Sequence, residues 1–423
     1  MALQTSSGWA ALKGLRGWMS KPLQYGILRV NTLRITPEEA LERTQTWLIK
    51  QASRQGRPVP EACIHPTLRE VISISAWPDA TPSTELSPDK ADLPVVIVDA
   101  SCANAVLRGA PIFQAGILAA SDNISVNSEV RIDVFREGFR KWIAYGIVRS
   151  DPETWETKPA CQGDLPKYDY AVGITGGLSI LPPTPRDLVE GGFIALQSVP
   201  SIVCSHVLDP QPGHRILDFG AGTGYMSSHI AALTSNEAEI TAVDHSASRL
   251  DTLVSRCKLL GAKVTPVHSD VNKFAKNESI GFDRVIVHPD HSVIGTRPMV
   301  VDLLGRGRGI NGKIREFVEI AVNLLKPGGR LVYCTGSIVP VENDAVVRWL
   351  LDRRKDLKLE PAEPRVAREG VRNPLPTPSW MSLTPDEEKL VQRFGPGTPE
   401  LESDPVLADV PGFFIACFSK VQS

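Results

Sequence analysis

Alternating glycines near the middle of the chain are suited to holding a small ligand through the backbone. The segment Asp218-Phe219-Gly220-Ala221-Gly222-Thr223-Gly224 lies between an apolar run at 216–217 and a helical pattern at 226–233. Glycine lets the main chain approach a ligand closely, and the first turn of a helix offers free N–H groups. The predicted cofactor loop is therefore Gly220, Ala221, Gly222, Thr223 and Gly224.

Three aspartates accompany this loop. Asp218 directly precedes the glycines, Asp244 ends the next apolar run, and Asp270 closes the third. At this spacing we expect the Asp244 carboxylate to accept both ribose hydroxyls of a nucleoside, with Asp270 near the adenine edge. A nicotinamide dinucleotide is an alternative ligand, but the Asp218 carboxylate would face its phosphates. S-adenosylmethionine (SAM) has no phosphate and carries an ammonium group, so SAM is the predicted cofactor.

The residues around the loop predict an α/β domain. From about Gly213 onward, apolar strands alternate with helical patterns, which is typical of a doubly wound, Rossmann-like parallel sheet. The expected strands lie at 215–217, 240–243, 263–267, 284–287 and 330–333. We assign residues 183–423 to this domain.

Two further segments precede it. Short β-branched runs with turn signals begin at Leu93 and predict a small β-barrel over residues 93–182. A polar linker at 78–90 separates this barrel from an N-terminal α/β segment, residues 1–92. In that first segment, Thr36-Pro37-Glu38-Glu39 predicts the start of a helix, with Thr36 as its N-cap.

Composition limits the possible partners and compartments. The formal net charge of −2 means that binding to RNA requires a local basic surface. The seven cysteines form no C-x-x-C pair, so we predict neither a metal site nor a disulfide framework. No apolar run approaches the roughly 18 residues of a membrane span. We expect a cytoplasmic protein; the basic stretch before Glu38, the first acidic residue, leaves a mitochondrial presequence as the alternative.

Several segments resemble the Sun-domain RNA cytosine-5 methyltransferases. Residues 98–110 resemble the core of a PUA domain, and residues 196–213 resemble the junction before the family's glycine loop. Further matches follow in the family's order at 282–287, 295–298, 324–329, 339–343 and 412–416. The resemblance covers most of the chain. It is greatest to the branch that carries a PUA domain inside its catalytic half and methylates tRNA.

The resemblance implies a class I SAM-dependent methyltransferase fold with an inserted PUA domain, and a tRNA-like partner. In the PUA-bearing branch, that domain grips the acceptor end of tRNA. We therefore predict RNA contacts at Arg108 and Gly109, where glycine lets a nucleotide approach the backbone, and at Arg297 in a matching segment. A simple turn in the barrel is the alternative interpretation of Arg108 and Gly109.

Methylation of cytosine at C5 requires a thiolate that adds to C6. In the family one cysteine lies in an Asp-Ala-Pro-Cys motif after strand four, and a second lies in a Thr-Cys-Ser or Thr-Cys-Thr motif after strand five. The resemblance places His288 at the motif aspartate, His291 at the first cysteine and Gly336 at the second. Cys334 lies two residues deeper, roughly 6–7 Å away, too far for a positioned nucleophile.

With both thiols replaced, we predict no catalytic residue. The main hypothesis is a protein that binds RNA and SAM on a methyltransferase scaffold, acting as a pseudoenzyme or assembly factor. The alternative is an active SAM-dependent RNA methyltransferase with altered chemistry, on a ring nitrogen or a ribose. His288 and His291 would then be an acid/base pair, although loop histidines are more often only hydrogen-bonded.

Overall fold

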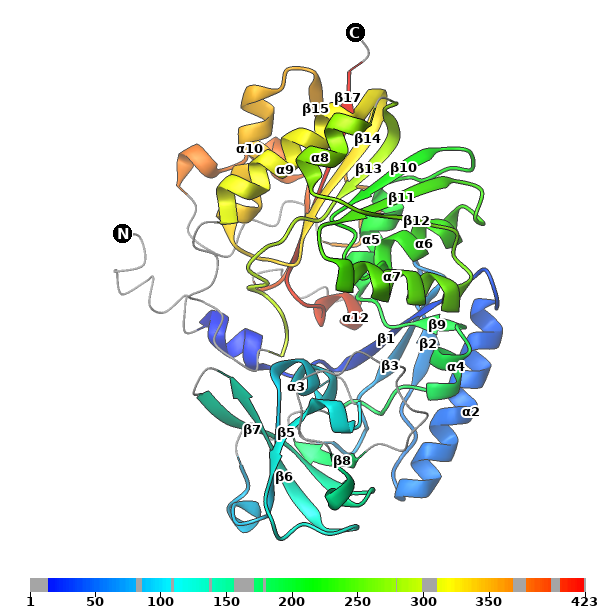
Figure 1. The fold of residues 1–423 in the computed structure, drawn as a ribbon, viewed down its shortest axis with the longest axis vertical. Coiled ribbons are helices and arrows are strands. Elements are labelled where there is room, and N and C mark those ends of the chain that lie inside the picture. Colours follow the sequence, from blue (N-terminus) through cyan, green and yellow to red (C-terminus); the bar gives the residue numbers. More distant parts are fainter. Residues whose placement is uncertain are drawn as a thin grey trace.

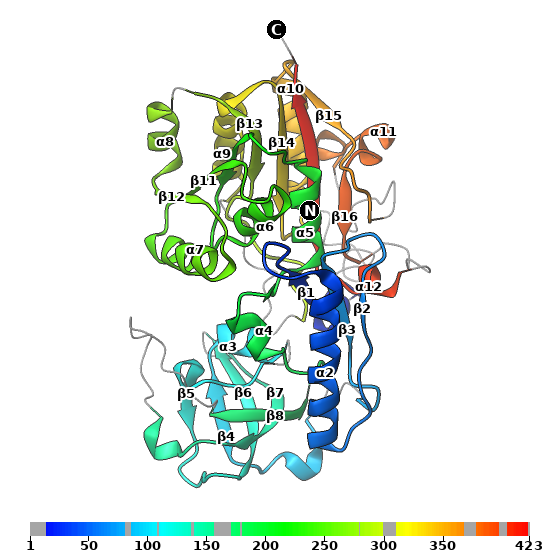
Figure 2. The same ribbon diagram turned by 90° about the vertical axis from the view of Figure 1, so that its right-hand side faces the viewer.

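Three β-sheets organise the chain in a computed structural model that describes residues 14–80, 86–107, 110–136, 139–155, 171–177, 180–278, 280–298, 310–367, 378–396 and 404–421. An N-terminal sheet lies at the centre of the molecule. An eight-stranded sheet lies at one end and a five-stranded sheet at the other (Figures 1 and 2). None of the described helices combines the length and apolar character that a bilayer span requires.

The central sheet has the order β2-β3-β1-β9. Its strands are β1 (Tyr25–Val30), β2 (Ala62–Ile64), β3 (Val71–Ser75) and β9 (Ile194–Ala195). Helix α2 (Pro37–Gln55) begins as the sequence predicts, since the Thr36 hydroxyl accepts a hydrogen bond from the Glu39 N–H over 3.2 Å. Residues 194–195, which the sequence analysis assigns to the third segment, therefore add a strand to the sheet of the first.

The five-stranded sheet has the order β5-β4-β6-β7-β8. Its strands are β4 (Val95–Val98), β5 (Ile117–Ala120), β6 (Glu129–Arg136), β7 (Phe139–Val148) and β8 (Val172–Gly177), with helix α3 (Ala100–Val106) after β4. Ile112 forms a bridge to Val172 on the edge strand β8. The bridge curls the sheet toward closure, in line with the predicted small barrel.

The eight-stranded sheet has the order β12-β11-β10-β13-β14-β17-β15, with β16 paired to β17. The strands are β10 (Arg215–Phe219), β11 (Glu239–Asp244), β12 (Thr265–His268), β13 (Phe282–Val287), β14 (Leu325–Thr335), β15 (Leu357–Glu360), β16 (Gln392–Phe394) and β17 (Phe413–Lys420). Strands β10 to β14 are parallel, whereas β17 is antiparallel to β14. The predicted doubly wound sheet is thus confirmed.

Helices cover both faces of this sheet because successive strand residues point in opposite directions. Ile216, Ile286 and Val332 pack with α5 and α6, whereas their neighbours Leu217 and Val285 pack with α9. The helices of this domain and the connections to it are α4 (Arg186–Glu190), α5 (Val199–Val207), α6 (Tyr225–Leu233), α7 (Ala247–Leu260), α8 (Val271–Asn277), α9 (Ile310–Leu324), α10 (Asp344–Arg353), α11 (Pro385–Glu388) and α12 (Pro405–Ala408).

The carboxyl ends of the parallel strands mark the edge where ligands bind in sheets of this type. Strand β17 runs toward the C-terminus at the top of Figure 1, and β14 runs the opposite way. The carboxyl ends of β10, β11, β13 and β14 therefore face the central sheet and the five-stranded sheet. Any ligand at this edge lies on the side of the molecule where the other two sheets are.

Candidate cofactor and substrate site

The glycine loop follows β10 and leads into α6. Gly220, Gly222 and Gly224 have φ angles of +83°, +55° and +80°, a region that favours glycine. A Cβ on Gly220 would lie 2.5 Å from the carbonyl oxygen of His288, whereas a Cβ on Gly222 would meet no atom of the described residues within 4 Å. Gly220 is thus required by packing, and Gly222 leaves open space next to the backbone that suits a ligand.

Asp244 ends β11 and fixes the loop from the neighbouring strand. Its carboxylate accepts hydrogen bonds from the N–H groups of Gly222, over 2.9 Å, and Ser246, over 2.8 Å. The Nε of Arg249 lies 3.2 Å from the same carboxylate, and its Nη1 lies 2.9 Å from Asp290. The predicted ribose-binding carboxylate is therefore next to the predicted loop, and Arg249 connects it to the loop after β13.

Asp218 lies beneath the glycines with only 1% of its surface exposed. It accepts a hydrogen bond from the Ser227 hydroxyl of α6. Burial raises the pKa of Asp218 to about 6. A positively charged ligand group beside this carboxyl would favour its ionised form.

Asp270 caps the next helix instead of lying in the interior. It is exposed, and its carboxylate accepts hydrogen bonds from Asn272 N, over 2.9 Å, and Lys273 N, over 3.3 Å. The N–H of Ser269, one residue earlier, donates to the backbone oxygen of Asp244 over 3.2 Å. Asp270 thus lies at the same carboxyl edge as Asp244, and its contact with adenine stays a prediction.

The positions assigned to the two family cysteines lie against each other. Gly336 N donates to His291 Nε2 over 3.0 Å, and His291 Nδ1 lies 2.9 Å from the carbonyl oxygen of Pro289. The ring centroids of His288 and His291 are 5.0 Å apart. The loop after β13 and the turn after β14 therefore form one polar site beside the glycine loop.

The buried carboxylate of Glu342 holds the loop after β13 in place. Glu342, 1% exposed, accepts hydrogen bonds from Ser292 N over 3.0 Å and from Ser292 Oγ over 2.8 Å. Asn343 Nδ2 donates to the carbonyl oxygen of Ser337 over 2.8 Å, and Thr335 Oγ1 donates to Asn343 Oδ1 over 2.6 Å. The segment after β14 thus positions both polar loops.

The sulfur of Cys334 lies in the core, beside β13 and α5. It is fully buried, 3.7 Å from the carbonyl oxygen of Val287, and packs in the core with Cys204 on α5. Burial, followed by the adjacent Cys334 thiol, raises the pKa of the Cys204 thiol well above its ordinary value. Within the part of the chain that the structure describes, the free thiol nearest in sequence to Gly336 is therefore held in the core.

Arg297, predicted to contact RNA, is 8% exposed. Its Nη2 lies 3.4 Å from an Asp409 oxygen, and its guanidinium lies over the Trp18 ring at 4.9 Å from the centroid. These contacts give Arg297 a packing role, and its binding to RNA stays a prediction. Arg108 and Gly109 lie outside the described residues.

Sequence reasoning missed one polar cluster. Glu70, His206 and His229 come from three distant parts of the sequence, and their donor atoms lie within 4.8 Å of one another. No spacing motif connects them, because His206 and His229 lie on different helices and Glu70 precedes β3. Only the packing of the central sheet on the eight-stranded sheet brings them together.

The parallel strand order, the glycine loop after β10 and the carboxylate at the end of β11 define a class I SAM-dependent methyltransferase fold. A family model described as 16S rRNA methyltransferase RsmB/F matches residues 205–417, and a PUA domain model matches residues 94–157. The chain belongs to this family of RNA cytosine-C5 methyltransferases.

Known relatives extend the similarity over nearly the whole chain. The tRNA (cytosine(72)-C(5))-methyltransferase NSUN6 of Mus musculus is 31% identical over 96% of this chain and 89% of its own length. The tRNA (cytosine(72)-C(5))-methyltransferase of Pyrococcus horikoshii is 30% identical over 81% of this chain and 82% of its own. The crystal structure of NSun6 from Pyrococcus horikoshii with SFG superposes with a TM-score of 0.73 at 27% identity, covering 98% of this chain and 96% of that one.

Proposed function

We propose that this protein binds SAM and a tRNA-like RNA without methylating cytosine at C5. The observation that carries the proposal is the hydrogen bond between Gly336 N and His291 Nε2, at the positions where the family resemblance expects two thiols. Neither glycine nor imidazole supplies the thiolate that cytosine C5 chemistry requires.

The hydrogen bonds of His291 also argue against its use as a general base. Nε2 accepts from Gly336 N, so the ring proton is on Nδ1, where it is donated to the Pro289 carbonyl oxygen. Both ring nitrogens are thus occupied. Burial lowers the pKa of His291 from its ordinary value, which keeps the ring neutral near pH 7.

His288 is the remaining candidate for proton transfer in the alternative function, an active methyltransferase with altered chemistry. Its Nε2 atom is shielded from solvent and has no hydrogen-bond partner among the described residues, so a local movement that exposes it would let it bond to a nucleotide. Burial, followed by the nearby His291, lowers the pKa of His288 to about 3. Such a ring is a weak proton acceptor, which supports a role in binding more than one in catalysis.

The cofactor part of the proposal rests on the glycine loop and its carboxylates. Gly222 leaves space beside its backbone, Asp244 holds that backbone, and Asp218 offers a buried carboxyl for the ammonium group of SAM. The similar Pyrococcus horikoshii structure was solved with SFG, an analogue of SAM. The chemistry that SAM would supply is transfer of its methyl group.

The RNA part rests on the relatives and on the second domain. Relatives similar over most of the chain are named as tRNA methyltransferases. The PUA segment lies on the side of the molecule that the carboxyl edge faces, which suits an RNA that extends from one domain to the other. We propose Arg108 and Gly109 as contacts to that RNA. A cytoplasmic location remains our expectation, with mitochondria as the alternative.

Incubation with methyl-labelled SAM and total tRNA tests the proposal. We expect RNA and SAM to bind, with no label in 5-methylcytosine above that of the Asp244→Ala variant. Label in 5-methylcytosine would contradict the proposal. Label in another nucleoside would favour the alternative function. Failure to recover RNA by crosslinking in cells would contradict the RNA-binding part of the proposal.

A restored site is the matched positive control. The variant His288→Asp/His291→Cys/Gly336→Cys puts the family's carboxylate and thiols back on the same loops. Cytosine methylation in this variant alone would show that the loop positions have been identified correctly. Cytosine methylation by both proteins would mean that the native chain uses another nucleophile.

A further inference from the structure

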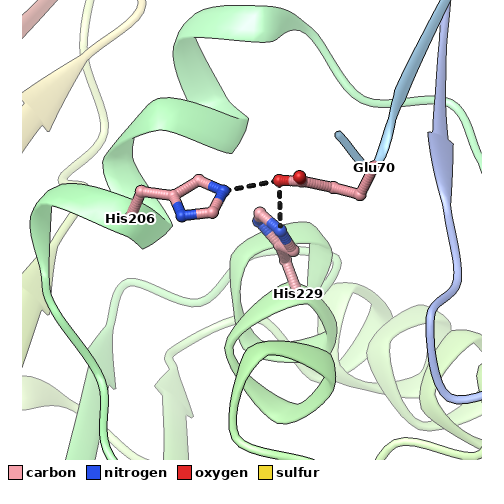
Figure 3. A group of neighbouring side chains, drawn as sticks. All are labelled: Glu70, His206 and His229. Atoms are coloured by element: carbon pink, nitrogen blue, oxygen red, sulfur yellow. Dashed lines mark hydrogen bonds and ion pairs between the residues drawn. The ribbon is translucent and has the colours of Figure 1, made fainter. Parts of the chain in front are cut away.

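Three side chains from separate elements converge between the central sheet and the eight-stranded sheet. Glu70 directly precedes β3, His206 lies on α5 and His229 lies on α6, and both imidazoles point toward the Glu70 carboxylate (Figure 3). Glu70 Oε1 lies 2.5 Å from His206 Nε2 and 3.3 Å from His229 Nε2. One carboxylate oxygen is thus shared by two imidazole nitrogens.

Among the described residues, the buried His229 has no well-formed hydrogen bond. The His229 side chain is 1% exposed, and its Nε2 lies 3.3 Å from Glu70 Oε1, but neither ring nitrogen makes a hydrogen bond of acceptable geometry to a described residue. The Glu70 residue is 8% exposed. Because an unpaired polar group in the interior loses its bonds to water, a ligand that binds the His229 nitrogen would recover that free energy.

The donor set matches the chemistry of zinc. Two imidazole nitrogens and one carboxylate oxygen form a known catalytic zinc set, with bonds of about 2.0–2.2 Å. In a tetrahedral site of that size the donors lie about 3.3 Å apart. Here all three donor atoms lie within 4.8 Å of one another. Small side-chain movements would therefore bring them to the required separation.

Arg29 is a positively charged neighbour that would repel a metal cation at this site. It is fully buried, and its Nη2 donates to Ser228 Oγ, beside His229, over 3.2 Å. Its charge and that of Glu70 cancel, so a divalent ion would leave a net charge of +2. Zinc bound by three neutral histidines, as in carbonic anhydrase, has the same net charge. His206, 25% exposed, leaves a route for the ion and for a water ligand.

We propose that Glu70, His206 and His229 form a binding site for a divalent transition metal ion of the zinc type. The ion joins the central sheet, through Glu70, to the methyltransferase domain, through α5 and α6. Binding therefore stabilises the packing of the two domains, because the ion binds only when they are docked. This site is separate from the glycine loop and does not depend on methyl transfer.

Zinc titration of the full chain after removal of metals with a chelator tests the proposal. We expect one Zn2+ per chain by calorimetry and an unfolding midpoint that rises with zinc concentration. His206→Ala should weaken zinc binding by about a hundredfold or more, since loss of a supporting residue alone costs 10–100-fold. His214→Ala, a histidine outside the cluster, is the matched control and should bind zinc like the wild type.

Glu70→Gln is a second variant in case His206→Ala does not fold, as judged by circular dichroism. Co2+ gives an independent readout, because its visible absorption in the wild type should have the intensity of a four-coordinate site. Absence of saturable zinc binding in the folded wild type would overturn the proposal. Equal zinc affinity in the wild type and in a folded cluster variant would also overturn it.

Discussion

Gly336 and His291 are hydrogen-bonded and tightly packed against each other. The N–H of Gly336 donates to His291 Nε2 over 3.0 Å, and a Cβ on Gly336 would lie 2.9 Å from that same nitrogen. The imidazole therefore occupies space that any side chain at position 336 would need. A change at one of the two positions consequently affects the other.

Replacement of Gly336 by alanine should destabilise the protein, because the new methyl group displaces the His291 ring. We expect Gly336→Ala to lower the free energy of unfolding by about 1–3 kcal/mol, a typical cost of overpacking. Denaturant unfolding of Gly336→Ala, His291→Ala and the double variant measures the coupling. Additive effects would show that the two residues do not compete for space.

Asp244→Ala should abolish SAM binding in a domain that still folds, at a cost of about 1–3 kcal/mol in stability for the lost buried acceptor. The change removes the acceptor for the Gly222 and Ser246 N–H groups and the predicted partner of the ribose. Calorimetric titration with SAM is the measurement. Asp251→Ala, an exposed change on the following helix, is the control and should bind like the wild type. Binding that survives in Asp244→Ala would place the cofactor elsewhere.

SAM affinity should depend on pH near 6. Burial raises the pKa of Asp218 to about 6, and in the proposed binding mode the ammonium group of SAM pairs with the ionised carboxylate. Affinity should therefore be constant well above pH 6 and fall about tenfold per pH unit below it. The raised pKa of Asp218 has the opposite effect on folding. A carboxyl whose pKa is raised in the folded state stabilises the protein at low pH, and this contribution is lost as pH rises through about 6.

The Asp218→Asn variant separates these effects. Its SAM affinity should be low and nearly independent of pH over this range. A wild-type affinity that does not change between pH 5 and 7 would mean that the ammonium group does not meet Asp218.

Two glycines of the cofactor loop should respond differently to alanine. Gly220→Ala combines a positive φ with a clash against the His288 backbone, and we expect a loss of about 2–5 kcal/mol in the free energy of unfolding. Gly222→Ala carries only the strain of its φ, about 1–2 kcal/mol, but fills the space beside the loop. Thermal unfolding and SAM titration of both variants check this. Equal stability losses would show that backbone strain outweighs the clash.

The methyltransferase domain was predictable because its signals are local. Most of the parallel strands are short apolar runs, and the glycines of the cofactor loop occur where the backbone requires positive φ angles. The cap of α2 at Thr36 was predictable for the same reason. Strand β7 (Phe139–Val148) was missed because basic residues interrupt its apolar pattern: Arg140, for example, pairs with Asp133 on β6 over 2.7 Å.

The side-chain environments could not be predicted from the sequence. Nothing local reveals that Arg297 packs on Trp18 and pairs with Asp409, since these partners are distant in the chain. The cluster of Glu70, His206 and His229 depends equally on how two sheets dock. The hydrogen bonds that occupy both nitrogens of His291 likewise arise only when the loops after β13 and β14 meet.

The segment that contains the five-stranded sheet begins and ends at nearly one point. The Trp77 N–H donates to the carbonyl oxygen of Ile180 over 2.9 Å, so the two ends of the intervening segment touch. Because the ends of this inserted segment lie together, a short linker can replace it at a small cost in loop-closure entropy. We therefore expect the PUA module to be exchangeable: joining Trp77 to Ile180 through a few residues should yield a folded methyltransferase domain, and the same junction should accept another RNA-binding module.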